Sequence, residues 1–270
     1  MNDNERPLRE PASTSDWVLG ILFGVLVFGS AAALTYDFRT LTGQSLSSPF
    51  GPQTSPARVS PGPPPLPGRE DQVRRYDPTG VPWRRSGQQV VLPGFEGDPD
   101  AALSQPMRFV PTDENAAIAI GRITLTSYQD FEDFLAEQPQ IDRLIMHSPG
   151  GSVRDAMGMA LLIRDMEIAT NVPENGYCAS SCPLAFAGGV TRTIGEDATI
   201  GVHQVFTAEG TVGSLQDGME GAQYVSSQAQ QLLDDMGVDP RAWIHAMATP
   251  PDQVYVFTEE ELDDLGWRRE

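Results

Sequence analysis

Apolar and polar positions divide this chain into three parts of different character. Trp17 to Leu34 is a run of 18 residues without a charged side chain. As a helix it would be about 27 Å long, which matches the hydrocarbon thickness of a bilayer. We therefore predict a membrane anchor over residues 17–36, preceded by an N-terminal tail over residues 1–16. A cleaved signal peptide is the alternative, because Ala31-Ala32-Ala33 resembles a cleavage site.

The second part, residues 37–106, is rich in proline, glycine and serine and has no hydrophobic periodicity. Such a composition cannot bury enough apolar surface to fold alone, so we predict an extended linker. Arg6 and Arg9 precede the predicted anchor, whereas Arg39 follows it. This bias predicts that the N-terminal tail is cytoplasmic and that the rest of the chain lies across the membrane.

The third part, residues 107–270, alternates between short apolar runs and segments with helical spacing. From Val153 to Met166 apolar residues recur every three or four positions, and a long helix is predicted over residues 216–236. Strands are predicted over residues 117–120, 143–146, 168–172 and 199–202. Strands that alternate with helices indicate an α/β domain built from parallel βαβ units.

Composition narrows the classes of function. The chain has a net charge of −19, concentrated in the third part, and it contains no lysine. An acidic surface repels nucleic acid, so we expect no nucleic-acid partner. Without lysine, a Ser–Lys dyad, a Schiff base and a P-loop lysine are all excluded. The chain has only two cysteines and three histidines, which argues against a zinc site. We therefore predict neither a metal nor a cofactor.

Three short stretches contain the residue types that are suited to chemistry. His147-Ser148-Pro149-Gly150-Gly151-Ser152 follows a predicted strand, Gly176 to Gly189 contains Ser180 and Ser181 ahead of an apolar run, and His203 ends another strand. The carboxyl ends of parallel strands meet at one edge of a sheet, where ligands bind. A serine, a histidine and exposed backbone N–H groups supply the nucleophile, the base and the oxyanion-binding donors of acyl transfer.

In their order and spacing, these stretches resemble the proteolytic subunit of the Clp protease. The motifs are Ser148-Pro149-Gly150-Gly151, then Gly176-Tyr177-Cys178-Ala179-Ser180 with Phe186-Ala187-Gly188-Gly189, and then Val202-His203-Gln204. The membrane-attached or periplasmic ClpP-like proteins of bacteria are more similar still. The resemblance covers roughly residues 115–268 and implies a ClpP/crotonase fold, which is a spiral of βαβ units.

By motif position, the resemblance makes Ser180 the nucleophile and His203 the base, with an oxyanion hole formed by the N–H groups of Gly151 and Ser181. It also implies a peptide or protein substrate and a homo-oligomer, since members of the family assemble as rings or trimers. The related signal peptide peptidase A enzymes share this fold but use a Ser–Lys dyad, which a chain without lysine cannot form.

The acid of the catalytic triad is the point at which this sequence departs from the family. The family has an aspartate at the position that corresponds to Val254, and Asp252 lies two residues earlier. Asp252 is therefore the candidate third residue, while a Ser–His dyad and an orienting group elsewhere in the chain are the alternatives. Triad acids hold the imidazole tautomer, and their loss can cost about 10⁴ in rate.

Cys178 and Cys182 flank the two serines. If residues 178–182 were helical, the two Cα atoms would lie about 6 Å apart, near the edge of the disulfide range. The predicted orientation puts this domain in the periplasm, where a disulfide persists. Two buried free thiols are the alternative to a disulfide.

The sequence thus favours a serine hydrolase, most simply a peptidase, anchored by a single span in the bacterial inner membrane with its domain in the periplasm. A catalytically inactive ClpP/crotonase-fold module for binding or assembly is the alternative. A crotonase that uses coenzyme A is a third hypothesis, which the acidic charge and the expected compartment disfavour.

Overall fold

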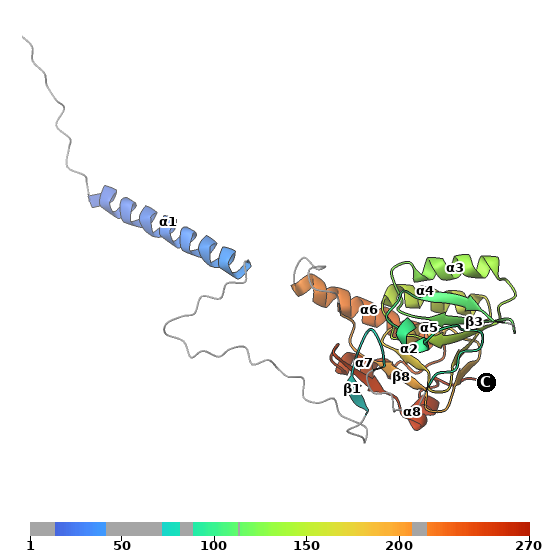
Figure 1. Cartoon of the computed structure of the whole chain (residues 1–270). Coiled ribbons are helices and arrows are strands. Elements are labelled where there is room, and N and C mark those ends of the chain that lie inside the picture. Colours follow the sequence, from blue (N-terminus) through green and yellow to red (C-terminus); the bar gives the residue numbers. More distant parts are fainter. Residues whose placement is uncertain (1–13, 42–71, 82–88, 113, 207–214) are drawn as a thin grey trace, which may run out of the picture. The chain divides into compact units, whose positions relative to one another are not determined.

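The computed structural model describes residues 14–41, 72–81, 89–112, 114–206 and 215–270, which fall into two separate units. The first unit contains helix α1 (Thr14–Leu41), drawn in blue in Figure 1. Its segment Trp17–Thr35 has a mean hydropathy of 2.3, and none of it is buried inside the structure. By length and composition this helix can cross a membrane, a property that it shares with signal sequences.

The second unit is a mixed α/β fold with two sheets. The larger sheet has the strand order β2-β3-β4-β5-β7, in which only β2 is antiparallel to its neighbour. The smaller sheet has the order β1-β9-β8-β6, with β6 parallel to β8 and β9 antiparallel to both β8 and β1. The strands are β1 (Val73–Arg75), β2 (Arg108–Pro111), β3 (Ala116–Ile120), β4 (Arg143–His147), β5 (Ala169–Val172), β6 (Tyr177–Ala179), β7 (Arg192–Ile194), β8 (Thr199–Val202) and β9 (Gln253–Val256).

Helices connect the strands of this unit, and the predicted alternation of strand and helix is confirmed. The helix predicted over Val153 to Met166 is α4, which ends one residue earlier, and the one predicted over residues 216–236 is α6, which begins and ends one residue earlier. The helices are α2 (Pro99–Ala102), α3 (Ser127–Glu137), α4 (Val153–Asp165), α5 (Cys182–Ala187), α6 (Leu215–Asp235), α7 (Ala242–Ala248) and α8 (Glu259–Asp264).

The larger sheet is covered on both faces. On one face, Ala117 and Leu144 belong to the main core together with Phe131 of α3 and Met159 of α4. On the other face, alternate residues of the same strands form a second cluster with residues of α2 and of the segment before it; its members are Val90, Leu92, Ala102, Ala116, Ile118, Ile120 and Ile145. Residues 89–103, which lie in the predicted linker, are therefore part of the folded unit.

The smaller sheet takes a second piece of the predicted linker. Strand β1 pairs with β9 in the register Val73↔Tyr255 and Arg75↔Gln253. A three-residue strand is too short to show a periodic sequence pattern. It forms because it pairs with a strand far along the chain. Composition alone therefore assigned these residues to the linker.

The two sheets meet where β4 ends. Beyond His147, the backbone N–H of Ser148 donates to the Tyr177 carbonyl at 2.7 Å, and the Ala179 N–H donates to the Ser148 carbonyl at 3.1 Å. One chain segment thus leaves the larger sheet and pairs with β6 of the smaller sheet. This junction brings the Pro149-Gly150-Gly151 loop beside the turn that contains Ser180.

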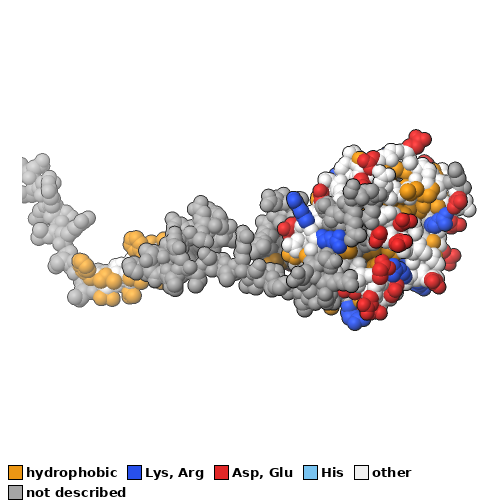
Figure 2. All heavy atoms as spheres, turned by 60° about the horizontal axis from the view of Figure 1, so that its bottom comes forward, with side chains coloured by type: hydrophobic (Ala, Val, Ile, Leu, Met, Phe, Trp, Pro, Cys, Tyr) orange, Lys and Arg blue, Asp and Glu red, His pale blue; other side chains and the backbone are white. Residues whose placement is uncertain are grey.

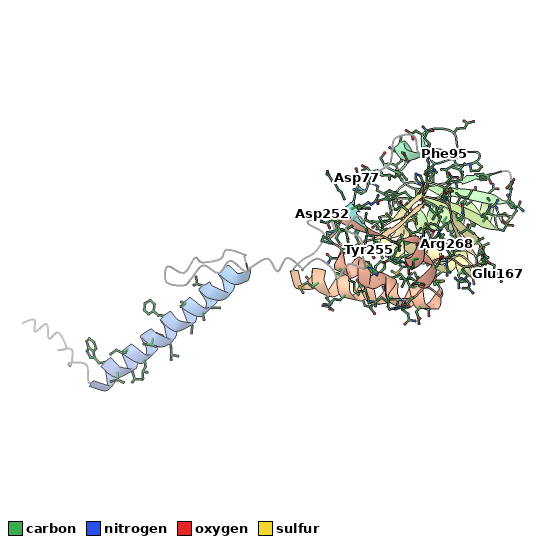
Figure 3. The ribbon with its side chains drawn as sticks, turned by 90° about the horizontal axis from the view of Figure 1, so that it is seen from below. Asp77, Phe95, Glu167, Asp252, Tyr255 and Arg268 are labelled. Atoms are coloured by element: carbon green, nitrogen blue, oxygen red, sulfur yellow. A yellow bond between two sulfur atoms is a disulfide. The ribbon has the colours of Figure 1, made fainter. Side chains whose placement is uncertain are left out.

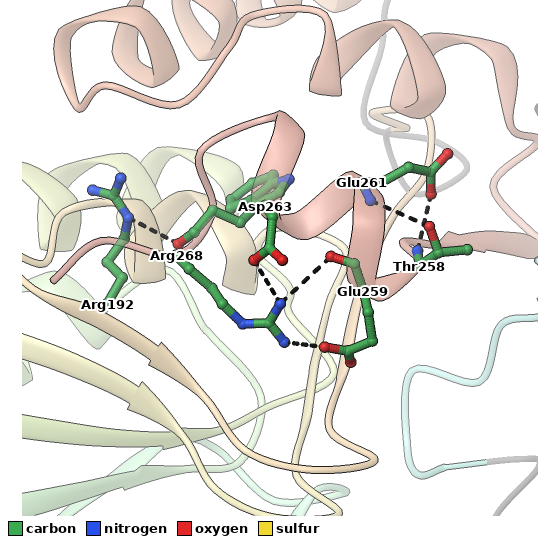
Figure 4. Close-up of polar contacts among 7 residues, drawn as sticks. Arg192, Thr258, Glu259, Glu261, Asp263 and Arg268 are labelled. Carbon is green, nitrogen blue, oxygen red and sulfur yellow. Dashed lines mark hydrogen bonds and ion pairs between the residues drawn. The ribbon is translucent and has the colours of Figure 1, made fainter.

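Helix α8 begins directly after β9 with a capping box formed by Thr258 and Glu261. The Thr258 hydroxyl accepts from the Glu261 N–H at 3.3 Å, and the Glu261 carboxylate accepts from the Thr258 N–H at 2.9 Å (Figure 4). Arg268 contacts the carboxylates of Glu259 and Asp263 in the same region (Figure 4). The face of the molecule drawn in Figure 2 carries many Asp and Glu side chains and fewer Arg, which agrees with the acidic composition.

Candidate active site

Ser180 lies in a tight turn between β6 and α5. Its φ is +62°, a left-handed conformation that is uncommon for a residue with a side chain and is found at functional turns. The Ser180 N–H donates to the Gly201 carbonyl of β8 at 2.9 Å, which ties the turn to the neighbouring parallel strand. Pro183, in the first turn of α5, then starts the helix. This strand–turn–helix arrangement is the one in which a serine hydroxyl stands free as a nucleophile.

The glycine pair packs against this turn and against the start of α3. Gly150 has a φ of +89°, and a Cβ atom there would lie 2.4 Å from the Ala179 carbonyl oxygen and 2.6 Å from the Ser180 Cβ. Gly151 has a φ of +144°, and a Cβ atom there would lie 2.0 Å from the Ile123 carbonyl oxygen. Both positions thus exclude any residue except glycine, and Gly150, to which the sequence motifs assigned no role of its own, is the one that touches Ser180.

Two backbone N–H groups beside Ser180 are open to a ligand. Among the described residues, neither the Gly151 N–H nor the Ser181 N–H donates to an acceptor. The Ser181 side chain is 1% exposed, and its hydroxyl has no partner in the described part of the chain. These are the donors that the sequence motifs predicted for an oxyanion hole.

His203 follows β8, next to the strand that precedes Ser180. Its ring is 4% exposed, and its Nδ1 lies 2.9 Å from the Gln204 carbonyl oxygen. A carbonyl oxygen only accepts, so Nδ1 carries the proton and Nε2 of the neutral ring carries a lone pair. That Nε2 atom is buried and has no hydrogen-bond partner among the described residues. Burial lowers the pKa of His203, and the Gln204 carbonyl opposes part of this effect.

Neither Asp252 nor Val254, the two positions considered for the acid, orients this ring in the described structure. Asp252 is exposed at the turn before β9 (Figure 3), and no hydrogen bond joins its carboxylate to His203 in the described part of the chain. Val254 is fully buried in an apolar cluster with Leu103, Tyr177 and Ala179. The group that orients His203 in this structure is the Gln204 carbonyl.

Tyr76 is a site residue that the sequence did not indicate. Its ring centroid lies 4.4 Å from that of His203, and its hydroxyl donates to the Pro149 carbonyl at 2.7 Å. Burial raises the pKa of Tyr76 to about 12, and a hydrogen bond with the Ser180 side chain opposes part of this rise. Tyr76 thus contacts both Ser180 and His203, while no hydrogen bond directly joins those two side chains within the described residues.

Cys178 and Cys182 are joined by a disulfide, with their Cα atoms 5.2 Å apart. Cys178 belongs to β6 and Cys182 begins α5, so the segment between them is a turn and not the helix considered from the spacing. The bond encloses Ser180 and Ser181 in a short covalent ring. Both cysteines are fully buried.

The pH dependence of the site follows from the burial of His203. A base must be neutral to accept a proton, and burial holds the His203 pKa below its ordinary value of 6.5. We therefore expect the rate at which a fluorophosphonate labels Ser180 to be maintained at pH 6.5 and to fall only at lower pH. Labelling rates measured from pH 5 to 8, with circular dichroism to confirm folding, test this, and a half-maximum above 6.5 would contradict it.

Comparison with known proteins gives structural resemblance alone. No protein-family model matches the sequence, and no curated protein matches it. A membrane-bound stomatin-specific protease, solved as a serine-to-alanine mutant, is 18% identical with a TM-score of 0.43 over 57% of this chain and 75% of its own. An asparagine-to-aspartate mutant of ClpP1 from Listeria monocytogenes is 15% identical with a TM-score of 0.46 over 58% of this chain and 90% of its own. The chain is thus structurally similar to a ClpP and to a membrane-bound protease, at low sequence identity and with TM-scores below 0.5.

Proposed function

We propose that this chain is a membrane-anchored serine hydrolase, a peptidase, with Ser180 as nucleophile and His203 as base. The state of the His203 ring supports this most directly. Its Nδ1–H is held by the Gln204 carbonyl, and its Nε2 lone pair is buried and unpartnered next to the strand that leads to Ser180. A buried polar atom without a partner costs free energy, and a role as proton acceptor accounts for that cost.

The chemistry follows from these groups. The Ser180 oxygen bonds to the carbonyl carbon of a peptide while its proton passes to Nε2 of His203. The negative charge on the former carbonyl oxygen is stabilised by the N–H groups of Gly151 and Ser181. The C–N bond then breaks as His203 returns the proton to the leaving amine, and water repeats the sequence to release the acid. A neutral carbonyl at Gln204 stabilises the imidazolium less than a carboxylate would, so we expect slower turnover than that of a triad enzyme.

The compartment is part of the same proposal. A helix able to span a membrane, preceded by Arg6 and Arg9, favours a cytoplasmic N-terminus and a periplasmic folded unit at the bacterial inner membrane. The Cys178–Cys182 disulfide is consistent with an oxidising compartment. Residues 42–71 then separate the membrane helix from the folded unit.

The test is to locate the adduct. The purified full chain in detergent is treated with a fluorophosphonate, digested and examined by mass spectrometry. We expect one adduct on Ser180 and none on Ser181, whose hydroxyl is buried beneath the turn. No adduct in the folded wild type or in any of the Tyr76 variants described below would overturn the hydrolase proposal and favour a non-catalytic binding module. An adduct on Ser181 would move the nucleophile by one residue.

A further inference from the structure

The segment Gln72–Asp77, here called the Tyr76 segment, lies along the outer edge of the smaller sheet. The Val256 N–H donates to the Gln72 carbonyl at 2.8 Å, and the Tyr76 N–H donates to the Asp252 carbonyl at 3.0 Å. Because β9 is antiparallel to both neighbours, this segment runs parallel to β8 and β6. Its carboxyl end therefore reaches the same edge of the sheet as Ser180 and His203, and Figure 3 shows Asp77 beside Asp252 there.

One side chain of this segment occupies the catalytic position. The Tyr76 ring packs on the His203 imidazole, its hydroxyl bonds to the carbonyl of Pro149, and it interacts with the Ser180 side chain. Pro149 immediately precedes the glycine loop that supplies one proposed oxyanion donor. A substrate carbonyl has to lie within reach of Ser180 and that loop. Tyr76 and a substrate peptide therefore compete for the same space.

The segment is held by side-chain contacts at its two ends, whereas the residues between them pair with β9 but bury less side-chain surface. At its start Gln72 is 4% exposed, and its Nε2 donates to the Tyr255 hydroxyl at 3.0 Å and to the Glu261 carboxylate at 2.8 Å. Arg75 is exposed, and Val73 and Arg74 are only half-buried. A strand with few buried side chains opens at a lower free-energy cost than the core strands of the same domain.

We infer that the Tyr76 segment is an autoinhibitory strand, which a substrate peptide in extended conformation displaces from β9 in order to reach Ser180. This inference rests on the proposed hydrolase function. Main-chain pairing along β9 gives such a peptide its affinity, in the manner of a strand added to a sheet edge. The segment is connected by residues 42–71 to the apolar helix, so the inhibitory strand and the membrane span belong to one continuous part of the chain.

Substitution of Tyr76 tests the inhibition directly. A strand that is closed in about nine molecules out of ten reduces the competent fraction about tenfold, so we expect Tyr76→Ala to raise the fluorophosphonate labelling rate at least tenfold. Tyr76→Phe keeps the ring in place and is expected to stay much nearer to wild type. Tyr224→Ala, at an exposed position on α6, is the matched control. A hydroxyl that takes part in catalysis would instead make both Tyr76 variants slower, and that result would overturn the inference.

A reversible lock gives a second test without loss of Tyr76. Arg75 and Gln253 face each other in a pair without mutual hydrogen bonds, where Cα atoms are about 4.5 Å apart and a disulfide fits. The variant Arg75→Cys/Gln253→Cys is expected to label at least tenfold more slowly when oxidised than when reduced. Wild type with and without reductant controls for the buried Cys178–Cys182 bond. Equal rates in the two states would contradict the inference.

Hydrogen exchange separates this inference from the hydrolase proposal. The Tyr76 and Val256 amides bond across β1 and β9, whereas the Phe257 amide donates to Ile200 of β8. We expect the first two amides to exchange at least tenfold faster than that of Phe257. Equal protection would mean that the segment opens only with the whole domain, which overturns the inference even if Ser180 is labelled. Fast exchange without labelling in any variant would overturn the hydrolase proposal and leave a mobile strand without an activity to inhibit.

Discussion

Replacement of His203 by glutamine is expected to lower the rate of Ser180 labelling by about 10² to 10⁴, the usual contribution of a general base. Glutamine keeps much of the size and polarity of the imidazole, but its amide cannot accept the proton of the Ser180 hydroxyl. The measurement is the second-order rate constant of fluorophosphonate labelling, taken on protein whose folding has been verified. A decrease of less than tenfold would mean that another group activates the serine.

Two variants make the loss at His203 interpretable. His245→Gln makes the same chemical change at a ring that stacks on Tyr255 with centroids 4.2 Å apart, outside the Ser180 turn, and is expected to label like wild type. Asp252→Asn is expected to do the same, because the Asp252 carboxylate is exposed and makes no bond to His203 in the described structure. A loss at Asp252→Asn comparable to that at His203→Gln would instead make Asp252 the orienting acid of the working enzyme.

Replacement of Arg192 by methionine is expected to destabilise the folded unit by about 3–5 kcal/mol. Arg192 is 2% exposed, and its guanidinium lies where the C-terminal ends of α5, α6 and α8 converge. A cation there is favoured by the three helix dipoles. The Arg192 guanidinium donates, at 2.8 to 3.2 Å, to the carbonyl oxygens of Ala187, Gly189, Met236, Gly266 and Trp267.

Methionine fills a similar volume but leaves the buried carbonyl groups of Gly266 and Trp267 without a donor, whereas those of Ala187, Gly189 and Met236 keep Arg164 as a donor. The free energy of unfolding, measured by urea titration, reports the effect. Arg143→Met is the matched control, since Arg143 pairs with Glu114 at the surface with 44% of its side chain exposed. Such a pair contributes about 0–1 kcal/mol. A change at Arg192 no larger than that of the control would show that water replaces the lost donors.

The domain pattern was predictable because its strands and helices have strong periodicity. The strand end before His203 was predictable for the same reason, whereas β6, the three-residue strand before Ser180, was not among the predicted strands and only the motif marked that turn. Tyr76 was not predictable, because β1 exists through its pairing with β9 and its residues have the composition of a linker. The Gln204 carbonyl was not predictable either, since every residue has such a group and only the fold selects one.

Val254 is a further position whose environment could not be predicted from the sequence alone. Counting along the sequence marked this position as the place where an acid was missing. In the structure its side chain belongs to the apolar packing around Leu103 and Tyr177. The sequence of β9 is therefore consistent with a buried strand, and a backbone carbonyl, that of Gln204, orients the histidine.

The buried disulfide around Ser180 has a consequence for the order in which the protein is made. Cys178 and Cys182 are fully buried once α5 has packed. An oxidant therefore has access to the two thiols only before α5 packs. Oxidation then has to precede the final closure of the domain. A chain that finished folding before it met an oxidising environment would keep two thiols under the turn. For the proposed periplasmic location, we expect translocation to come first, formation of the Cys178–Cys182 bond second and packing of the α5 region last.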